Sequence, residues 1–378
     1  MYSLQDLSDK FFDKVSTNKA LFALFLVGSL AAILVGVYWM NKYQSVVVKG
    51  DVETVEFVGG EGLVEKEEEE RRYSVVLAGR GGDGHAGGTL ADSIIVLTAN
   101  LDTKKATFIT VPRDLWVPIP HDWENKANYK INAAYNIGLD NVRYANKKPE
   151  FRGSEGAGNL LGHVAGEVVG IPIDYFAVVD FDRFKNLIDT LGGITVEVPE
   201  TFADNFYPVK GLENETCGFS NEKIADVHAK YSGFQLEKQF TCRYETIAYD
   251  KGPADLTGDM ALKFVRSRHG DSDFGRSKRQ IAVLEGIAKK LVSLDAVKKG
   301  SKLLKDLSEM VDTNMGLSAM GTLIDIIGNP QEYETERLYI TEDNLVNSSK
   351  ASDGQYILLP KAGNNNFSGI KSYIQENI

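Results

Sequence analysis

The longest hydrophobic run in the chain lies near its start. Residues 20–40 (ALFALFLVGSLAAILVGVYWM) form 21 consecutive positions without a charge, closed by Tyr38 and Trp39. A helix of this length spans roughly 30 Å, the thickness of a bilayer's hydrocarbon core, and the aromatic pair suits the headgroup region. The pattern predicts a transmembrane anchor. The alternatives are a buried core helix, which is seldom apolar on every face, and a cleaved signal peptide, which would be shorter and end in small residues.

The segments on either side of this run are polar. Lysines stand on both sides of it, so the prediction that residues 1–19 are cytoplasmic rests mainly on the shortness of that flank. The main part of the chain would then lie outside the cytoplasm. Residues 41–72 end in a run of glutamates and arginines, which is typical of a solvated linker.

From residue 73 onward, short apolar or β-branched runs alternate with segments of helical spacing. We predict strands at 73–78, 93–100, 106–111, 173–179, 194–198, 265–268 and 355–359, with residues 101–105 joining two of them as a hairpin. We predict helices at 160–169, 181–191, 256–264, 276–292 and 296–327. This mixed order predicts an α/β domain over residues 73–378, a three-layer α-β-α sandwich with a mixed central sheet.

Residues 200–255 interrupt the alternation. They are polar, weakly periodic and contain Cys217 and Cys242, the only cysteines of the chain, which predicts an insertion or a large loop. An oxidising compartment would let the two cysteines form a disulfide. The alternative is two unrelated free thiols.

The overall charge argues against one functional class, the nucleic-acid-binding proteins. The chain has 378 residues and a formal net charge of −11. A nucleic-acid partner is therefore not expected, because such proteins carry a basic footprint. Affinity for phosphate groups would have to come from a local cluster of basic residues.

Residues 263–280 hold such a cluster, with six lysines and arginines among 18 positions. On the predicted strand, Arg266 and Arg268 would share a face, and on the following helix Arg276 and Gln280 would share another. Three guanidinium groups beside a helix N-terminus suit an anion with several oxygens, such as pyrophosphate. The alternative is a solvated surface strand paired with Asp271 and Asp273.

Two further segments carry candidate chemistry. Pro112 ends a predicted strand, so Arg113 would emerge at the sheet edge, where Asp114 could hold its guanidinium. In the glycine-rich stretch 79–93, Asp83 and Asp92 could share a divalent cation whose shell is completed by phosphate oxygens. The alternative is a flexible loop in which Asp92 caps a turn.

Seven short motifs occur in a recognisable order: 90–96, 111–114, 130–135, 170–176, 179–181, 191–194, and 265–268 followed by Asp273 and 276–280. In this order and spacing they resemble the LytR-CpsA-Psr family of cell-envelope proteins. The resemblance implies an α-β-α sandwich with an apolar interior that holds a lipid tail.

The resemblance also implies an activity. It would be a membrane-anchored phosphotransferase that moves a glycopolymer-phosphate from a polyprenyl-pyrophosphate carrier to a hydroxyl of peptidoglycan or another envelope acceptor. By motif position, Asp92 would bind Mg²⁺ or Mn²⁺, and a set of arginines would grip the pyrophosphate with support from Asp273 and Gln280. That set is Arg113, Arg266, Arg268 and Arg276.

The chain departs from the family pattern in its first loop and in its second motif. Gly79-Arg80-Gly81 stands where the family commonly has an aspartate, so Asp83 is the nearest second carboxylate. In the second motif, Leu90-Ala91 stands where family members often carry an arginine, and Arg80 could supply that positive charge from a shifted position. The altered first loop leaves open an alternative function, a catalytically weak scaffold that binds polyprenyl pyrophosphate.

Overall fold

The computed structural model describes residues 71–82, 87–123, 125–270, 272–293, 310–316, 326 and 332–378. The chain forms two compact units, one of Met1–Thr190 with Ala288–Ile378 and the other of Leu191–Ile287. The predicted anchor, the linker up to residue 70 and Asp83 lie outside the described residues. Most of the predicted helix at 296–327 also lies outside them. Within its described part the prediction is wrong at Asp312 and Thr313, because these residues pair as a short strand with Val178 and Ala177. Within the described ranges, no helix is long and apolar enough to cross a bilayer.

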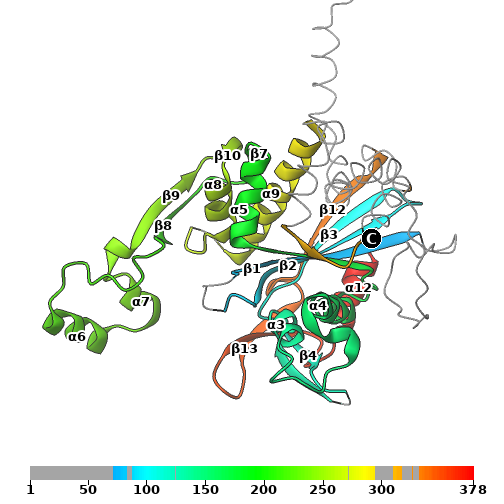
Figure 1. Cartoon of the computed structure of the whole chain (residues 1–378), viewed down its shortest axis with the longest axis horizontal. Coiled ribbons are helices and arrows are strands. Elements are labelled where there is room, and N and C mark those ends of the chain that lie inside the picture. The colour runs from blue at the N-terminus through cyan, green and yellow to red at the C-terminus, as the bar shows by residue number, and fades with distance from the viewer. Residues whose placement is uncertain are drawn as a thin grey trace, which may run out of the picture. The chain divides into compact units, whose positions relative to one another are not determined.

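The first unit has a mixed α/β fold built on a six-stranded mixed sheet, shown in Figure 1. Its strands are β1 (Arg72–Arg80), β2 (Ala91–Asn100), β3 (Lys105–Thr110), β6 (Tyr175–Asp180), β11 (Asp312–Thr313) and β12 (Glu334–Tyr339), in the order β11-β6-β1-β2-β3-β12. The strands β1, β2 and β3 form an antiparallel meander, which confirms the predicted hairpin. The strands β6 and β12 run parallel to their neighbours β1 and β3, and the edge strand β11 runs antiparallel to β6.

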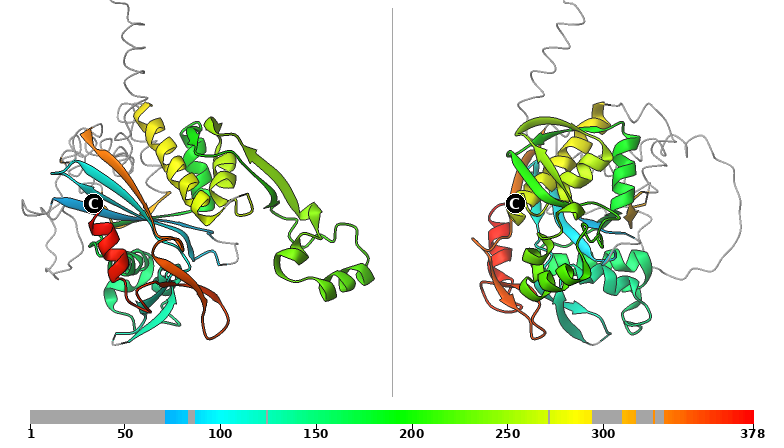
Figure 2. Two further views of the ribbon diagram at one scale, coloured as in Figure 1. Left: turned by 180° about the vertical axis from the view of Figure 1, so that it is seen from behind. Right: turned by 90° about the vertical axis from the view of Figure 1, so that its left-hand side faces the viewer.

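Both faces of this sheet are buried. Val76, Val96 and Ile109 point toward a core that is covered by α3 (Ala133–Leu139), α4 (Gly153–Val169) and α12 (Ser368–Gln375). Figures 1 and 2 show these three helices together on one side of the sheet. The alternate residues Leu97 and Phe108 point to the opposite face and are also buried, which explains why the centres of the strands lack an alternation of apolar and polar residues.

The helix α4 begins earlier than predicted but ends where expected. Gly170, in the left-handed conformation at φ 76°, caps its end, as the glycine and nearby proline predict. The first unit also contains η3 (Pro149–Phe151) and α5 (Phe181–Thr190), and two hairpins, β4 (Trp116–Pro120) with β5 (Lys126–Lys130) and β13 (Val346–Lys350) with β14 (Tyr356–Pro360).

The second unit pairs β7 (Ile194–Val198) with β10 (Gly252–Leu256), and it contains α8 (Gly258–Arg266) and the first part of α9 (Asp273–Ser293). The predicted insertion is ordered. Its strands β8 (Phe202–Pro208) and β9 (Tyr244–Tyr249) form an antiparallel ribbon leading to α6 (Asn221–Lys230), α7 (Gly233–Glu237) and η4 (Thr241–Arg243), as Figure 1 shows. We call residues 202–249 the arm.

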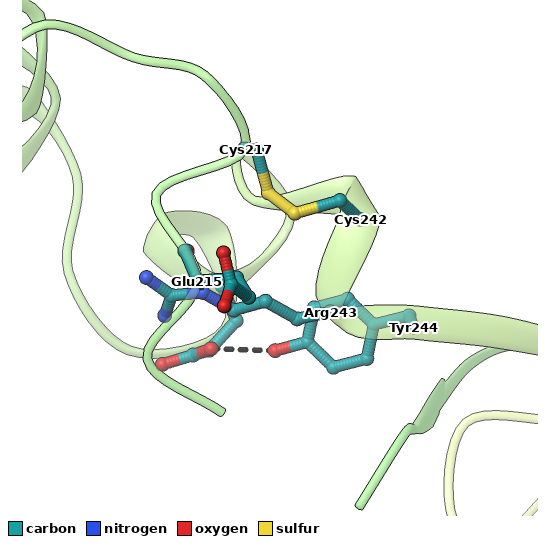
Figure 3. Close-up of a disulfide and its surroundings, with 6 residues drawn as sticks. Glu215, Cys217, Cys242, Arg243 and Tyr244 are labelled. Carbon is teal, nitrogen blue, oxygen red and sulfur yellow. Dashed lines mark hydrogen bonds between the residues drawn. A yellow bond between two sulfur atoms is a disulfide. The ribbon is translucent and has the colours of Figure 1, made fainter. Parts of the chain in front are cut away.

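A disulfide joins Cys217 and Cys242 in the arm, with a Cα–Cα distance of 5.5 Å (Figure 3). The adjacent Arg243 donates from Nε to the carbonyl of Glu215 at 2.7 Å, which ties the same two segments together a second time. The expectation of a disulfide is therefore confirmed, and the alternative of free thiols is wrong.

The predicted strand at 265–268 is wrong. Val265 and Arg266 are the last residues of α8, and Ser267–Gly270 form a loop instead of a strand. The reason is that Thr257 caps the helix by accepting from Met260 N, while Ala261, Leu262 and Phe264 are buried on one face, so the helical pattern continues to Arg266. The next helix, α9, likewise starts at Asp273 rather than 276.

Candidate functional site

Charged side chains gather at one end of the central sheet. Arg80 ends β1 and lies opposite Asp180, the last residue of the parallel strand β6. On its other side, β1 pairs with the antiparallel strand β2. Arg80 lies there opposite Ala91, the neighbour of Asp92 at the start of β2. The strand β3 runs to the same end and is followed by Arg113. The register of four strands thus places Arg80, Asp92, Arg113 and Asp180 at this one end.

Two carboxylates hold Arg113. Its Nη1 donates to Asp92 Oδ1 at 2.5 Å, and its Nε lies 3.4 Å from Asp114 Oδ2. Lys130 in turn donates from Nζ to the other oxygen of Asp114 at 2.7 Å. The prediction that Asp114 would hold this guanidinium is confirmed, and Asp92 is a second partner that the sequence did not indicate.

Arg80 lies in a second ionic cluster. Its Nη2 is 3.5 Å from Asp180 and 3.8 Å from Asp312, and the side chain is only 12% exposed. Its buried Nε has no hydrogen-bond partner within the described part of the chain. Arg183 completes the cluster, 3.3 Å from Asp180 and 2.9 Å from Asp312. The arginine proposed to supply positive charge therefore keeps an unused donor.

Tyr135 from α3 extends this cluster. Its hydroxyl donates to Asp312 Oδ2 at 3.4 Å. Burial, and secondarily the nearby Asp312 carboxylate, raises the pKa of Tyr135 to about 12, so the hydroxyl stays protonated and remains a donor.

Several of these partners were not identified as site residues from the sequence. Lys130, Tyr135 and Asp180 stand inside the motifs 130–135 and 179–181, which was the available signal for them. Arg183 and Asp312 stand in no motif, and their 129-residue separation gave no pattern to detect.

The residues present fit a divalent cation only in part. Asp92 has an exposed fraction of 39% and can offer a carboxylate oxygen, whereas Asp83 is outside the described residues. No group of three or more histidines, cysteines or carboxylates suited to a metal is found in the ranges that the structure describes. Mg²⁺ commonly binds one or two carboxylates and takes its other ligands from water and phosphate, so Asp92 could contribute one ligand.

The other predicted site residues lie in the second unit. Arg266 ends α8 and Arg268 is exposed in the loop that follows, so the two do not share a strand face as predicted. Arg276 and Gln280 lie one helical turn apart in α9, as predicted, and Asp273 is the first residue of that helix. The structure thus groups the candidates in two sets, one in each unit, and a single site made from both stays a prediction.

The family profile decides where this chain belongs. The LytR_cpsA_psr family matches residues 40–366. The chain belongs to the LytR-CpsA-Psr family. It is 26% identical over 311 residues to a Bacillus licheniformis protein named polyisoprenyl-teichoic acid–peptidoglycan teichoic acid transferase TagU, covering 81% of this chain and 78% of that one.

A second relative is the Bacillus subtilis TagV of the same transferase name, which is 27% identical over 257 residues. That match covers 68% of this chain but only 52% of TagV, so the chain spans about half the length of that relative.

Solved structures show the same fold. The crystal structure of B. subtilis TagV aligns over 81% of this chain and 97% of that one, with a TM-score of 0.51 and 24% identity. The protein gbs0355 from Streptococcus agalactiae aligns over 81% of this chain and 87% of its own, with a TM-score of 0.54 and 19% identity.

One cavity of the first unit lies away from Arg80. This cavity of about 540 Å³ opens beside α4 and the start of β6, lined by polar groups that include His163, Glu167 and Asp174. Asp174 precedes β6, whereas Asp180 ends it, so this cavity is at the opposite end of the strand from Arg80. The apolar interior implied by the resemblance stays a prediction.

Proposed function

We propose that this protein transfers a glycopolymer-phosphate from a polyprenyl-pyrophosphate carrier to a hydroxyl group of peptidoglycan or another cell-envelope acceptor. The observation that carries the proposal is Arg113, held by Asp92 and Asp114 at the same sheet end as Arg80 and its unused Nε. The names of TagU and TagV, which are polyisoprenyl-teichoic acid–peptidoglycan teichoic acid transferases, support this reaction class.

In the proposed reaction, the acceptor hydroxyl attacks the phosphorus that carries the glycopolymer. A new P–O bond forms to the acceptor, the bond to the bridging oxygen of the pyrophosphate breaks, and polyprenyl phosphate leaves while the hydroxyl proton passes to solvent. Such a transfer needs positioning and charge neutralisation more than covalent catalysis.

The arginines supply that neutralisation. The side chains that would contact the pyrophosphate are Arg80, Arg113, Arg266, Arg268 and Arg276, with Gln280 and Asp273 as supporting residues. Guanidinium groups suit this task because they remain charged and bind phosphate oxygens in pairs.

Asp92, with Asp83 as the second candidate, would hold Mg²⁺ or Mn²⁺. The ion would lower the negative charge of the bound pyrophosphate. Residues 20–40 would anchor the protein in the membrane, with residues 1–19 inside and residues 73–378 outside as a three-layer sandwich. This arrangement places the site next to a lipid-linked donor, and it includes no nucleic-acid partner.

The test is a transfer assay with the purified protein and a lipid-pyrophosphate-linked sugar donor. We expect Arg113→Ala and Arg266→Ala each to lower the release of polyprenyl phosphate at least tenfold, the order of effect of removing one well-placed charged donor. Arg71→Ala is the matched control, because Arg71 forms an exposed pair with Asp102 at the opposite end of β1. Full activity of both site variants would contradict the proposal, and donor binding without turnover in the wild type would favour the scaffold alternative.

A further inference from the structure

The loop from Ser267 to Gly270 joins α8 to α9 and carries Arg268. Ser267 is completely buried, whereas Arg268 and His269 are exposed. The loop therefore has a fixed base in the second unit and presents a guanidinium to solvent. The contacts that hold Ser267 therefore determine which positions the guanidinium of Arg268 can reach.

Asp204 of the arm makes three hydrogen bonds to this loop. Its Oδ2 accepts from Ser267 Oγ at 2.8 Å, from Arg268 N at 3.2 Å and from His269 N at 3.1 Å. The carboxylate belongs to a residue that is only 1% exposed, and a buried carboxylate is costly unless such bonds compensate it. Three bonds to three successive residues indicate that Asp204 is placed for this loop.

An irregularity in the arm aims Asp204 at the loop. The register of β8 against β9 shifts between Asp204 and Tyr207, and the other oxygen of Asp204 accepts from Phe206 N at 2.8 Å. Bulges of this kind reorient a side chain relative to the regular ladder. The arm is thus shaped locally to direct a carboxylate toward Ser267.

Two more contacts fix the loop against its surroundings. Arg279 of α9, only 2% exposed, donates from Nη2 to Ser267 O and from Nε to Phe264 O, both at 2.8 Å. Gly270 lies so close to β8 that an added Cβ would stand 2.7 Å from the Phe202 ring and 2.9 Å from Ala203 O. The buried carboxylate of Asp204 and the buried guanidinium of Arg279 therefore both hydrogen-bond to Ser267.

The outer part of the arm also reaches the loop. The ring of Phe234 in α7 stacks on His269 with a centroid distance of 4.1 Å and an interplanar angle of 5°. Phe206 packs edge-on against Phe234 at 5.3 Å, and Lys238 Nζ lies 4.7 Å from the centroid of the Phe234 ring. The arm thus contacts the loop on both sides of Arg268, through Asp204 at its base and Phe234 farther out.

We propose that the arm positions Arg268 for pyrophosphate binding, with Asp204 as the positioning residue and Phe234 as its support. This inference rests on the proposed function, in which Arg268 contacts the pyrophosphate. Asp204 does not touch the ligand; it orders the backbone on either side of the arginine, which reduces the conformational entropy lost when the guanidinium binds.

The experiment is a double-mutant cycle on the full-length protein, with geranylgeranyl pyrophosphate and Mg²⁺ as the probe. We expect Arg268→Ala and Asp204→Ala each to weaken binding about tenfold, and the double variant to bind no more weakly than Arg268→Ala alone. Asp204→Asn keeps a carbonyl oxygen as acceptor and should recover most of the lost affinity. Asp226→Ala is the control, because Asp226 lies in α6 of the same arm and pairs with Lys230 on the surface.

A second measurement does not depend on any ligand. Hydrogen exchange at the amides of Arg268 and His269 should accelerate at least tenfold in Asp204→Ala and remain unchanged in Asp226→Ala. Additive losses in the double-mutant cycle would overturn the inference, because they would mean that Asp204 acts independently of Arg268.

The outcomes separate this inference from the proposed function. If Arg268→Ala weakens binding and Asp204→Ala does not, the positioning role is wrong and the proposed function stands. If Arg268→Ala binds the probe normally, the pyrophosphate role of the loop is wrong and the inference fails with it.

Discussion

The guanidinium of Arg113 lies 2.5 Å from the carboxylate of Asp92, although the two residues are 21 positions apart in the chain. The pair joins the residue proposed to bind phosphate to the residue proposed to bind a cation. A bound Mg²⁺-pyrophosphate would offer each of them a stronger partner, the phosphate for Arg113 and the cation for Asp92. In the proposed function the pair would serve as a preformed site, in which each charge holds the other in place until the ligand binds.

This relationship leads to a prediction about metal dependence. Chelation should abolish transfer by the wild type, and Mg²⁺ or Mn²⁺ should restore it. Asp92→Asn should raise the metal concentration needed for half-maximal activity roughly tenfold or more, since a ligand oxygen loses its charge. Asp102→Asn at the other end of β2 is the control, and an unchanged metal requirement in Asp92→Asn would exclude Asp92 as a ligand.

A second prediction concerns Asp312, which lies near both Arg80 and Arg183. Asp312→Ala would leave two guanidinium groups with Asp180 alone, so we expect the free energy of unfolding to fall by about 2 kcal/mol. Asp312→Asn keeps an acceptor for Arg183 and Tyr135 and should lose less. Urea denaturation compares the two variants, and equal losses would mean that the charge of Asp312 matters more than its hydrogen bonds.

The third prediction concerns alkaline pH. Burial is the main cause that raises the pKa to about 12 in five tyrosines, which are Tyr135, Tyr175, Tyr244, Tyr249 and Tyr333. The unfolded chain releases these protons near pH 10, whereas the folded chain keeps them. The free energy of unfolding that these five raised pKa values contribute is therefore fully present below pH 10 and is lost as the pH rises toward 12.

Spectrophotometric titration of phenolate absorbance checks this expectation. The folded protein should show a fraction of its 16 tyrosines ionising about two pH units later than in the urea-unfolded protein. Tyr244→Phe should remove one member of the late group, because burial and its 2.5 Å hydrogen bond to Glu237 hold that hydroxyl protonated. A single transition near pH 10 in the folded protein would contradict the assignment.

The fourth prediction tests the packing of α4 on the sheet. A Cβ added at Gly158 would stand 2.3 Å from ring carbons of Phe176 in β6. Gly158→Ala should therefore destabilise the first unit by about 1–3 kcal/mol, since neither the helix nor the buried ring can move freely. Gly369→Ala in α12 is the matched control because it is also a helical glycine and its added Cβ meets open space, and equal stability of the two variants would argue against this close approach.

The fifth prediction concerns the disulfide of the arm. Closing the loop between Cys217 and Cys242 contributes about 3.5 kcal/mol on a chain-entropy basis. We expect hydrogen exchange in α6 to accelerate when the wild type is reduced and to be equally fast in the Cys217→Ser/Cys242→Ser variant with or without reductant. If reduction leaves the exchange of α6 unchanged, then other contacts stabilise the tip of the arm.

Four of the six strands of the central sheet could be predicted, because β1, β2, β3 and β6 satisfy local rules. The centres of β1, β2 and β3 are buried on both faces and are therefore mainly apolar, and a short polar turn separates β2 from β3. The strands of the arm were missed for the opposite reason. In β8 only one face is covered, and polar residues such as Asp204 and Asn205 weaken its apolar pattern. The strands β11 and β12 were not predicted, because β11 has only two residues and β12 is rich in polar residues.

The candidate site was predicted only where charge and local structure coincide in sequence. Arg113 follows a proline that ends a strand, and Asp114 is its direct neighbour, so their contact could be anticipated. The contact of Asp92 with Arg113, and those of Arg80 with Asp180 and Asp312, depend on strand register between distant segments. The strand predicted at 265–268 was wrong because a β-branched residue beside alternating arginines also fits the last turn of a helix.

The arm consists of a ribbon, β8 with β9, and a tip that packs back on the ribbon through Phe234. The pairing of β8 with β9 continues to Val209, whose N–H donates to Arg243 O at 2.9 Å, and residues 210–242 form the tip. Replacing residues 210–242 by a short hairpin turn would delete the tip with its disulfide and Phe234 but keep Asp204 against Ser267. Such a variant would separate the contribution of Asp204 to the placement of Arg268 from that of Phe234.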